Sequence, residues 1–427
     1  METQDTTGEL LRDTLSRRYD VVRQTTETLA RPLAIEDFGL QAMEDVSPAK
    51  WHLAHTTWFF ETFVLSSRGE FKPFQEEYKR LFNSYYESVG QFWPRAQRGL
   101  LSRPSVDEIY GYRESVDYQI RQFIVNASSS DFAALAPIIL LGLHHEQQHQ
   151  ELFLTDIKYN LSINPLRPPY SVLVPVVPLS KRPVAWRSFS GGLVQMGFSG
   201  NGFCFDNELP PHRVWIEPFR LQDRLVTNGE YLAFIEDGGY QKAAFWLSAG
   251  WHDVKANHWR APLYWENTDG QWQYYTLGGM EAIDWDAPVS HVSYFEADAF
   301  ARWAGKRLCR ESEWEVAVAG LDPAQGNFLD SRQLRPVSAF PGDERLVQMF
   351  GDVWEWTESA YSPYPGYRAA SGALGEYNGK FMSGQQVLRG GSCVTPLSHI
   401  RPTYRNFFPP DARWQFSGIR LAEDLRE

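Results

Sequence analysis

Several histidines of this chain are concentrated in one short segment. Residues 143–152 read Leu-His-His-Glu-Gln-Gln-His-Gln-Glu-Leu, within a long stretch of helical pattern. On a helix, His145 and His149 lie one turn apart on the same face, so their imidazoles can bind one metal ion together. His144 points about 100° away from His145, and we expect it to be a hydrogen-bonded structural residue. The spacing therefore predicts a metal site on this helix.

A third ligand is available from an earlier part of the chain. His52 and His55 precede the first segment by about ninety residues of mostly helical pattern, and one of them would complete a three-histidine site. Three neutral imidazoles leave a divalent metal with its full charge and with open coordination positions. Such a site suits a substrate that brings its own anionic donor, such as a thiolate, together with a small oxidant. Imidazole binds zinc and iron alike, so the ligand type alone leaves the metal open.

The same segment also fits a zinc hydrolase. His145-Glu146-Gln-Gln-His149 matches the H-E-x-x-H pattern, in which the glutamate serves as the base of a zinc peptidase. A peptidase normally takes its third ligand downstream, and no matching histidine or glutamate follows on a recognisable second helix. The hydrolase therefore remains the second hypothesis.

Four stretches with apolar residues at helical spacing must position these histidines. Pro48 stands near the start of the second stretch, where it suits a first helical turn. Four such helices in roughly the first 160 residues predict an antiparallel bundle with the ligands projecting into its core. The stretches are 8–35, 48–66, 105–126 and 131–160.

The composition changes at Asn164, which predicts a second domain. Residues 164–184 are rich in proline and resemble a linker. Residues 185–427 are rich in glycine and aromatic residues and contain short alternating runs, which predicts a mixed α+β domain. Two helical stretches stand out there, 227–237 and 295–304, and the second is expected to continue through Arg307–Glu315. The predicted order is a helical domain over 1–163, a linker, and the α+β domain.

Composition and charge exclude several classes of function. The formal net charge is −12 and no lysine- or arginine-rich run is present, which argues against a nucleic acid partner. The longest apolar run, 132–143, is too short to span a bilayer, and the first thirty residues lack an apolar signal core. Three cysteines are too few and too scattered for a disulfide framework. We therefore expect a cytoplasmic protein that binds neither membranes nor nucleic acid.

The second half carries blocks that resemble the formylglycine-generating-enzyme (sulfatase-modifying factor) domain. This resemblance implies a variant of the C-type lectin fold over roughly 185–425. The formylglycine generators place two copper-binding cysteines shortly after the R-G-G-S block, where this chain has Thr395 and Ile400, so sulfatase activation is not expected. The blocks are Gly192-Leu-Val-Gln-Met-Gly, the segment from Pro288 to Glu315, Gly351-Asp-Val-Trp-Glu-Trp-Thr, Arg389-Gly-Gly-Ser and Ser417-Gly-Ile-Arg-Leu-Ala.

The first half resembles the DinB-type four-helix bundle, with Leu53-Ala-His and His-Glu-Gln-Gln-His as its metal motifs. That bundle followed by a formylglycine-generating-enzyme-like domain resembles the ergothioneine-biosynthetic sulfoxide synthases. The resemblance implies a nonheme Fe(II) enzyme that uses O2 to join a cysteine-type thiol to the imidazole C2 of Nα-trimethylhistidine (hercynine).

The resemblance also implies roles for individual residues of the bundle. His55, His145 and His149 match the iron ligands, and Gln148 matches the glutamine that holds the hercynine imidazole; its alternative role is as a partner of a ligand. The acid that serves oxygen activation is expected at Tyr85 or Tyr86, with Tyr86 favoured. Tyr361 and Tyr364 are the alternative pair, and aromatic packing is the competing explanation for each tyrosine.

Substrate anchors are implied in both halves. Arg95 and Arg98 resemble the arginines that bind the thiol carboxylate, although an arginine at such a place is often simply solvated. Asn406, Phe407 and Phe416 are expected near the trimethylammonium group, which favours aromatic faces and amide oxygens. The loop continues with Phe408-Pro-Pro instead of charged anchors for γ-glutamylcysteine. Cysteine is therefore the expected thiol, with γ-glutamylcysteine second.

Two further hypotheses remain beside the sulfoxide synthase and the zinc hydrolase. One is a DinB-type thiol transferase, in which the metal only activates a thiol. The other is a non-catalytic sugar- or peptide-binding protein built on the lectin-like half, and the intact set of histidines argues against it. Dependence on O2 separates the synthase from all three.

Overall fold

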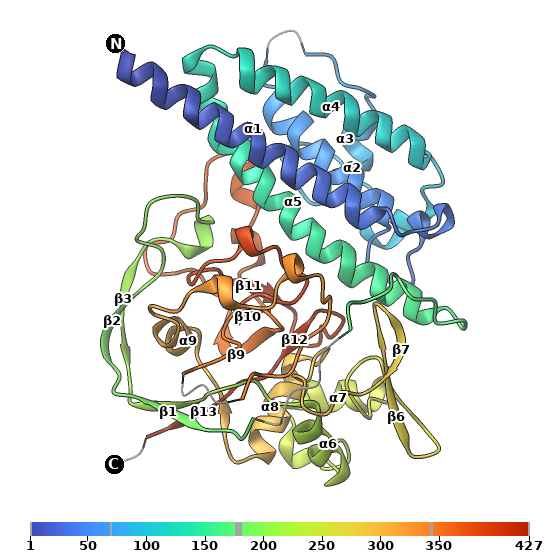
Figure 1. Cartoon of the computed structure of the whole chain (residues 1–427), viewed down its shortest axis with the longest axis vertical. Helices are drawn as coiled ribbons and strands as arrows, with labels where there is room; N and C mark the ends of the chain where they lie inside the picture. Colours follow the sequence, from blue (N-terminus) through green and yellow to red (C-terminus); the bar gives the residue numbers. More distant parts are fainter. Residues whose placement is uncertain (1, 69–70, 176–181, 342–344, 426–427) are drawn as a thin grey trace. The chain divides into compact units, whose positions relative to one another are not determined.

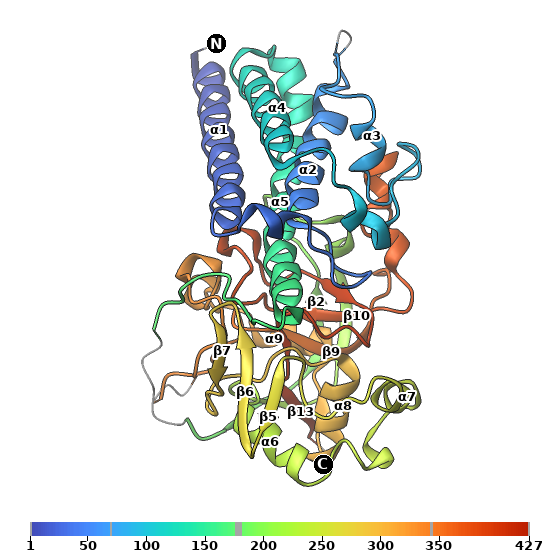
Figure 2. The ribbon, with the colours of Figure 1, turned by 90° about the vertical axis from the view of Figure 1, so that its right-hand side faces the viewer.

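A computed structural model describes residues 2–68, 71–175, 182–341 and 345–425 of the chain. These residues form two compact units (Figures 1 and 2). The first comprises Met1–Pro165 together with Gly372–Glu376, and the second comprises Leu166–Ser371 and Tyr377–Glu427. Among the described residues, no helix combines the length and the apolar character needed to cross a membrane.

Four long helices form the first unit, at the places that the helical spacing predicted. Two of them begin at serine caps: the Ser105 hydroxyl accepts from the Glu108 amide, and the Ser128 hydroxyl accepts from the Asp131 amide. In both views α1, α4 and α5 run alongside one another (Figures 1 and 2). The helices are α1 (Glu2–Ala30), α2 (Ala49–Phe60), α4 (Val106–Asn126) and α5 (Ser129–Ile163), with a short α3 (Tyr78–Leu81) between α2 and α4.

Helix α2 is the central element of this unit. Every one of its residues, Ala49–Phe60, is buried, and it packs against both α4 and α5. A helix that is buried on all sides must lie inside the fold. A π-helical turn, Glu61–Leu65, extends it. The side chains of α2 therefore reach the core of the bundle from all faces, His52 and His55 included.

In its described residues, the second unit contains four small sheets and four α-helices. The helices are α6 (Asn228–Glu236), α7 (Ser248–Ala256), α8 (Tyr294–Trp303) and α9 (Glu311–Ala317). One four-stranded sheet has the order β1 (Trp186–Phe189), β4 (Phe219–Gln222), β13 (Leu421–Asp424), β8 (Arg307–Leu308). The other has the order β11 (Asn406–Phe408), β10 (Gln386–Arg389), β9 (Trp354–Ala360), β12 (Ser417–Gly418). Two ribbons complete the unit, β2–β3 (Gly192–Met196, His212–Ile216) and β5–β6–β7 (Trp265–Thr268, Gln271–Thr276, Gly279–Ala282).

The strand pairings bring the two ends of the second unit together. β13, near the C-terminus, pairs with β4 and β8 in antiparallel register, while β12 is parallel to β9. The buried core cluster of this unit includes Phe219 of β4, Trp314 of α9 and Phe350. A helical bundle followed by a mixed α and β unit confirms the predicted fold class.

Two details of the second unit differ from the prediction. The helix of 295–304 does not continue through Arg307–Glu315: α8 ends at Trp303, Gly305 has a φ of +65°, and the chain forms β8 before α9 begins. Glycine adopts this left-handed conformation without the steric cost of a Cβ, which favours the end of the helix here. Helix α7 was not anticipated.

Part of the proline-rich segment packs as an integral part of the second unit. Tyr170 is buried, and its amide donates to the Leu277 carbonyl at 2.9 Å. Near the other end, Arg182 is buried and paired with Asp223 at 2.8 Å. Residues 176–181 of the predicted linker lie outside the described residues.

Candidate metal centre

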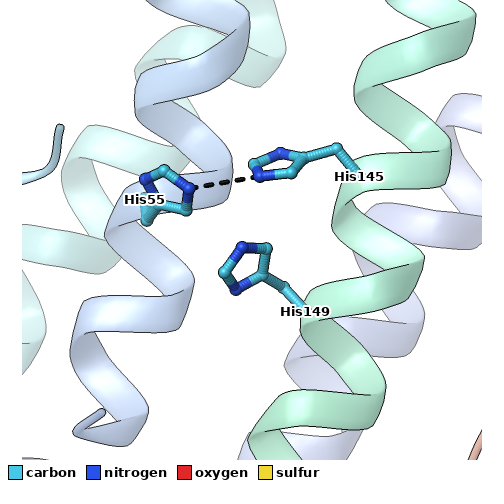
Figure 3. A group of neighbouring side chains, drawn as sticks. All are labelled: His55, His145 and His149. Carbon is cyan, nitrogen blue, oxygen red and sulfur yellow. Dashed lines mark hydrogen bonds between the residues drawn. The ribbon is translucent and has the colours of Figure 1, made fainter. Parts of the chain in front are cut away.

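Three imidazoles from two helices of the first unit meet at one point. His55 lies on α2, and His145 and His149 lie one turn apart on α5. One nitrogen from each ring lies within 4.8 Å of the others, and the rings point toward one another (Figure 3). The Nε2 atoms of His55 and His145 are 3.1 Å apart. The structure thus brings together the three histidines that were predicted as ligands.

The hydrogen bond of His55 determines which of its nitrogens faces the site. Its Nδ1 lies 2.6 Å from the carbonyl oxygen of Phe82, which can only accept a hydrogen bond. The ring therefore carries its proton on Nδ1 and keeps a bare lone pair on Nε2. That lone pair is directed toward His145 and is available to a metal.

Burial keeps the three rings neutral. It lowers the pKa of His55 and of His149 well below the usual value, and each is lowered further by His145. Burial also lowers the pKa of His145 to about 3. A neutral imidazole is the form that binds a metal. The cluster is therefore a set of three neutral nitrogen donors, which fits a divalent first-row metal.

Glu146 does not face this cluster. Its carboxylate is fully buried and accepts from Arg23 at 2.8 Å, from Arg113 at 2.6 Å and from the Thr26 hydroxyl at 2.7 Å. Burial alone would raise its pKa, but the two guanidinium groups and Thr26 hold the pKa down at about 2. A carboxylate held by two arginines is unsuited to act as a general base, which argues against the H-E-x-x-H hydrolase.

The same network fixes the rotation of α5. Arg23 comes from α1 and also pairs with Asp117 of α4 at 2.7 Å, while Arg113 comes from α4. One face of α5 is therefore tied to α1 and α4, and the face with His145 and His149 is turned toward α2. His144, as predicted, is a structural residue whose Nε2 lies 2.8 Å from Arg18.

The cluster is more accessible at one end than at the other. The side chains of His55 and His145 are buried, whereas His149 is half-buried. Gln148, the predicted partner of the hercynine imidazole, is half-buried as well. A small molecule would therefore approach the cluster from the side on which Gln148 and His149 lie.

Arg98 lies in a stack of planar groups beside the cluster. Its guanidinium carbon is 3.4 Å from the centroid of the Trp51 ring, and Trp51 stacks on His55 with centroids 4.5 Å apart. Arg98 is only 4% exposed and donates to the Ser47 hydroxyl at 2.9 Å. It is therefore not a solvated arginine. Arg95 differs from it, since it is exposed and donates to the Asp45 carbonyl.

The two predicted tyrosines lie next to the cluster rather than within it. Tyr86 is fully buried, and its ring centroid is 5.7 Å from that of Trp58, which in turn stacks on His55 at 5.5 Å. Tyr85 is half-buried and stacks on Tyr86. The Asn83 side chain accepts from the Tyr86 amide and donates to the Tyr86 carbonyl, both at 3.0 Å. The local turn therefore holds Tyr86 firmly.

The remaining predicted residues belong to the second unit. Asn406 and Phe407 lie on β11, and Phe407 stacks on Tyr361 with centroids 4.1 Å apart. Tyr361 also accepts from Asn207 at 3.0 Å, and Arg405 lies over the Tyr364 ring at 4.0 Å. Tyr364 also packs against the His212 ring, with centroids 4.4 Å apart, so both tyrosines take part in aromatic packing.

Phe416 lies in the core of the second unit. It is 1% exposed and packs against His291, with ring centroids 4.5 Å apart. This position favours a packing role over the substrate contact that was predicted for it.

Comparisons with known proteins cover both units. Residues 18–153 match the DinB superfamily, and residues 187–425 match the sulfatase-modifying factor enzyme 1-like domain. A hercynine oxygenase from Mycolicibacterium thermoresistibile is 33% identical over 96% of this chain and 95% of the relative. Its counterpart from Mycolicibacterium smegmatis is 32% identical over 97% of this chain and 100% of the relative. A formylglycine-generating enzyme from Streptomyces coelicolor is 32% identical but covers only 55% of this chain.

The match with the hercynine oxygenases thus spans the helical unit and its histidines as well as the α+β unit. Because the match covers almost the whole length of the chain, the chain belongs to the hercynine oxygenase family and is an enzyme of the oxygenase class.

Proposed function

We propose that this enzyme is a nonheme Fe(II) sulfoxide synthase of ergothioneine biosynthesis. It joins the sulfur of cysteine, or of γ-glutamylcysteine, to the imidazole C2 of hercynine. The C2–H and S–H bonds break, a C–S bond forms, and the sulfur takes up one oxygen atom of O2. The other oxygen atom leaves as water with the two hydrogens, so that atoms and electrons balance.

The observation that carries this proposal is the cluster of three neutral imidazoles, His55, His145 and His149. These residues would hold the metal. When bound, Fe(II) would pass electrons from the two substrates to O2 and would place the thiolate beside the imidazole of hercynine. Three neutral ligands leave the positive charge of the metal for the thiolate to balance.

Gln148 is proposed to hold the hercynine imidazole. Its amide offers both a donor and an acceptor, as a ring with one N–H and one bare nitrogen requires. It precedes the ligand His149 directly and is half-buried at the accessible end of the cluster. The position supports a contact with a substrate that lies against the metal.

Arg98 is proposed to bind the carboxylate of the thiol substrate. Burial, followed by the nearby Arg95, lowers its pKa well below the usual value, so an anion at this place would compensate a buried cation. Its Nε–H has no hydrogen-bond acceptor among the described residues. Arg95 is proposed as a weaker, exposed anchor. Free cysteine is the preferred thiol in this proposal.

Tyr86 is proposed as the proton donor during O2 reduction, with Tyr85 stacked on it. The phenol Oη would give up a proton to the reduced oxygen. For the trimethylammonium group of hercynine we propose Asn406 and Phe407, whose amide oxygen and aromatic face suit a quaternary cation.

We also propose a cytoplasmic location, which the free thiols of Cys204, Cys309 and Cys393 support.

A metal and oxygen substitution experiment tests the proposal. The apoprotein is loaded anaerobically with Fe(II) or Zn(II) and incubated with hercynine and cysteine, with or without O2. The product is identified by mass spectrometry. We expect a hercynine–cysteine sulfoxide only with Fe(II) and O2 together. Adduct formation with Zn(II), or without O2, would instead support a thiol transferase.

A further inference from the structure

A second histidine of α2 contacts one of the metal ligands. His52 is 2% exposed, and its Nδ1 lies 2.9 Å from the Nδ1 of His149. On its other side, its Nε2 lies 3.1 Å from the Oδ2 of Asp156. Asp156 is buried on α5, about two turns beyond His149. Asp156, His52 and His149 thus form a continuous chain of hydrogen-bonded groups.

We infer that Asp156 and His52 are positioning residues that fix His149 as a metal ligand through its Nε2. The inference rests on the proposed metal centre and deepens it. This inference assigns a function to His52, the histidine of α2 that does not belong to the three-histidine cluster. It also assigns one to Asp156, which is part of no motif recognised in the sequence.

The direction of the hydrogen bonds follows from the chemistry of each group. A carboxylate accepts only, so the Nε2 of His52 carries a proton and donates it to Asp156. A neutral imidazole has one N–H, which leaves the Nδ1 of His52 bare. The Nδ1 of His149 must then donate to it. His149 therefore carries its single proton on Nδ1, and its Nε2 keeps the lone pair that a metal needs.

The hydrogen-bonded series Asp156–His52–His149 is fixed at its Asp156 end. The same Oδ2 of Asp156 accepts from the backbone amide of Ser47 at 2.8 Å, just before α2 begins. The carboxylate is therefore held in place by two donors before any metal binds. His55 reaches the same tautomer through the Phe82 carbonyl. Two of the three ligands are thus oriented by separate neutral acceptors, the Phe82 carbonyl and the His52 ring, and the Asp156 carboxylate lies behind the second of these.

The carboxylate of Asp156 affects His149 as a metal ligand. The three imidazoles bring no negative charge to the metal. Asp156 lies one imidazole behind a ligand, so it raises the basicity of His149 without occupying a coordination position. The open positions stay available for thiolate and O2, as the proposed reaction requires.

Fe(II) affinity of the full-length protein tests this arrangement, measured anaerobically by competition with a chelator. His52→Leu removes both hydrogen bonds, whereas His52→Gln keeps an acceptor and a donor on one planar group. His144→Leu is the matched control, because it removes a buried hydrogen-bonded histidine of the same bundle outside the site. We expect His52→Leu to weaken Fe(II) binding about 10- to 100-fold and the other two variants to stay within about threefold of wild type.

A measurement on the wild type keeps the inference testable even if His52→Leu does not fold. In the Zn(II)-loaded protein with ¹⁵N-labelled histidines, long-range ¹H–¹⁵N correlations report which nitrogen of each ring carries the proton. We expect His149 to be protonated on Nδ1 and metal-bound through Nε2, and His52 to be protonated on Nε2.

The outcomes separate this inference from the proposed function. A wild-type protein that binds no metal would overturn the metal centre and the inference with it. Tight metal binding with a proton on Nε2 of His149, or with equal affinities of His52→Leu and wild type, would overturn the inference alone.

Discussion

Trp51 stacks on His55, with ring centroids 4.5 Å apart and planes within 11° of parallel. Because Trp51 also contacts the guanidinium of Arg98, the indole connects a proposed metal ligand with a proposed substrate anchor. Cation–π contact with a desolvated indole holds a guanidinium in one orientation. Contact with the Trp51 indole stabilises the buried Arg98 guanidinium beside the proposed site of a divalent metal ion.

The role of Arg98 can be tested by Arg98→Met. Loss of a charge-assisted hydrogen bond to the thiol carboxylate is expected to raise the KM for cysteine about 10- to 100-fold. The KM for hercynine should change little, because the contact proposed for Arg98 is with the thiol carboxylate alone. Steady-state kinetics with each substrate varied in turn measures both. Arg95→Met is the matched control, and a larger effect there than at Arg98 would contradict the assignment.

Glu146→Gln distinguishes a structural carboxylate from a catalytic one. Because Arg23 and Arg113 each lose one anionic partner in the core, the variant is expected to unfold at a lower temperature than wild type. Its kcat per bound iron should stay within about threefold of wild type, since the carboxylate faces away from the imidazoles. Thermal unfolding and turnover of the Fe(II)-loaded protein are the two readouts. A loss of kcat of about a hundredfold or more, with the fold intact, would restore the general-base hypothesis.

Tyr86→Phe removes the proposed proton donor and leaves the aromatic packing in place. Loss of a general acid typically lowers the rate by about 100-fold or more, so sulfoxide formation at saturating substrate should fall to that extent. Tyr85→Phe, the neighbouring ring of the same stack, is expected to retain most of the activity. If Tyr85→Phe is the more damaging change, the two roles are reversed.

The thiol of Cys204 is expected to be unreactive at neutral pH. Burial, followed by the nearby Glu208, raises its pKa to about 11. A raised pKa means that the thiolate, which is the nucleophile, forms only as the pH rises toward that value. At pH 8 its alkylation by iodoacetamide should therefore be about a hundredfold slower than that of an exposed thiol. The pH dependence of alkylation, followed by peptide mass spectrometry, measures this; an inflection near pH 8.5 would contradict the expectation.

The helical half could be predicted from sequence because its signals are local. Apolar spacing located the four long helices, and the spacing of His145 and His149 on one of them identified their common face. The choice of His55 over His52 came only from the resemblance to Leu-Ala-His. Spacing cannot make that choice, since both histidines of α2 are buried near α5.

Other parts of the site are produced by tertiary packing and had no sequence signal. Arg23, Arg113 and Asp156 lie far apart in the chain and meet their partners only after the helices have packed. Arg98 belongs to a short 3₁₀ helix, Arg95–Leu100, and nothing in that segment indicated that one arginine would be buried and the other exposed. In the α+β unit, Gly305 ended a helix that the apolar spacing alone would have continued.

In the proposed reaction, the Fe(II)-loaded enzyme uses O2 both to form the C–S bond and to oxidise the sulfur. Turnover of hercynine and cysteine under ¹⁸O2, followed by mass spectrometry of the product, tests it most directly. We expect a hercynine–cysteine sulfoxide that carries one ¹⁸O atom, with O2 consumed in equimolar amount. An unlabelled adduct, or O2 consumption that oxidises cysteine without joining it to hercynine, would contradict it.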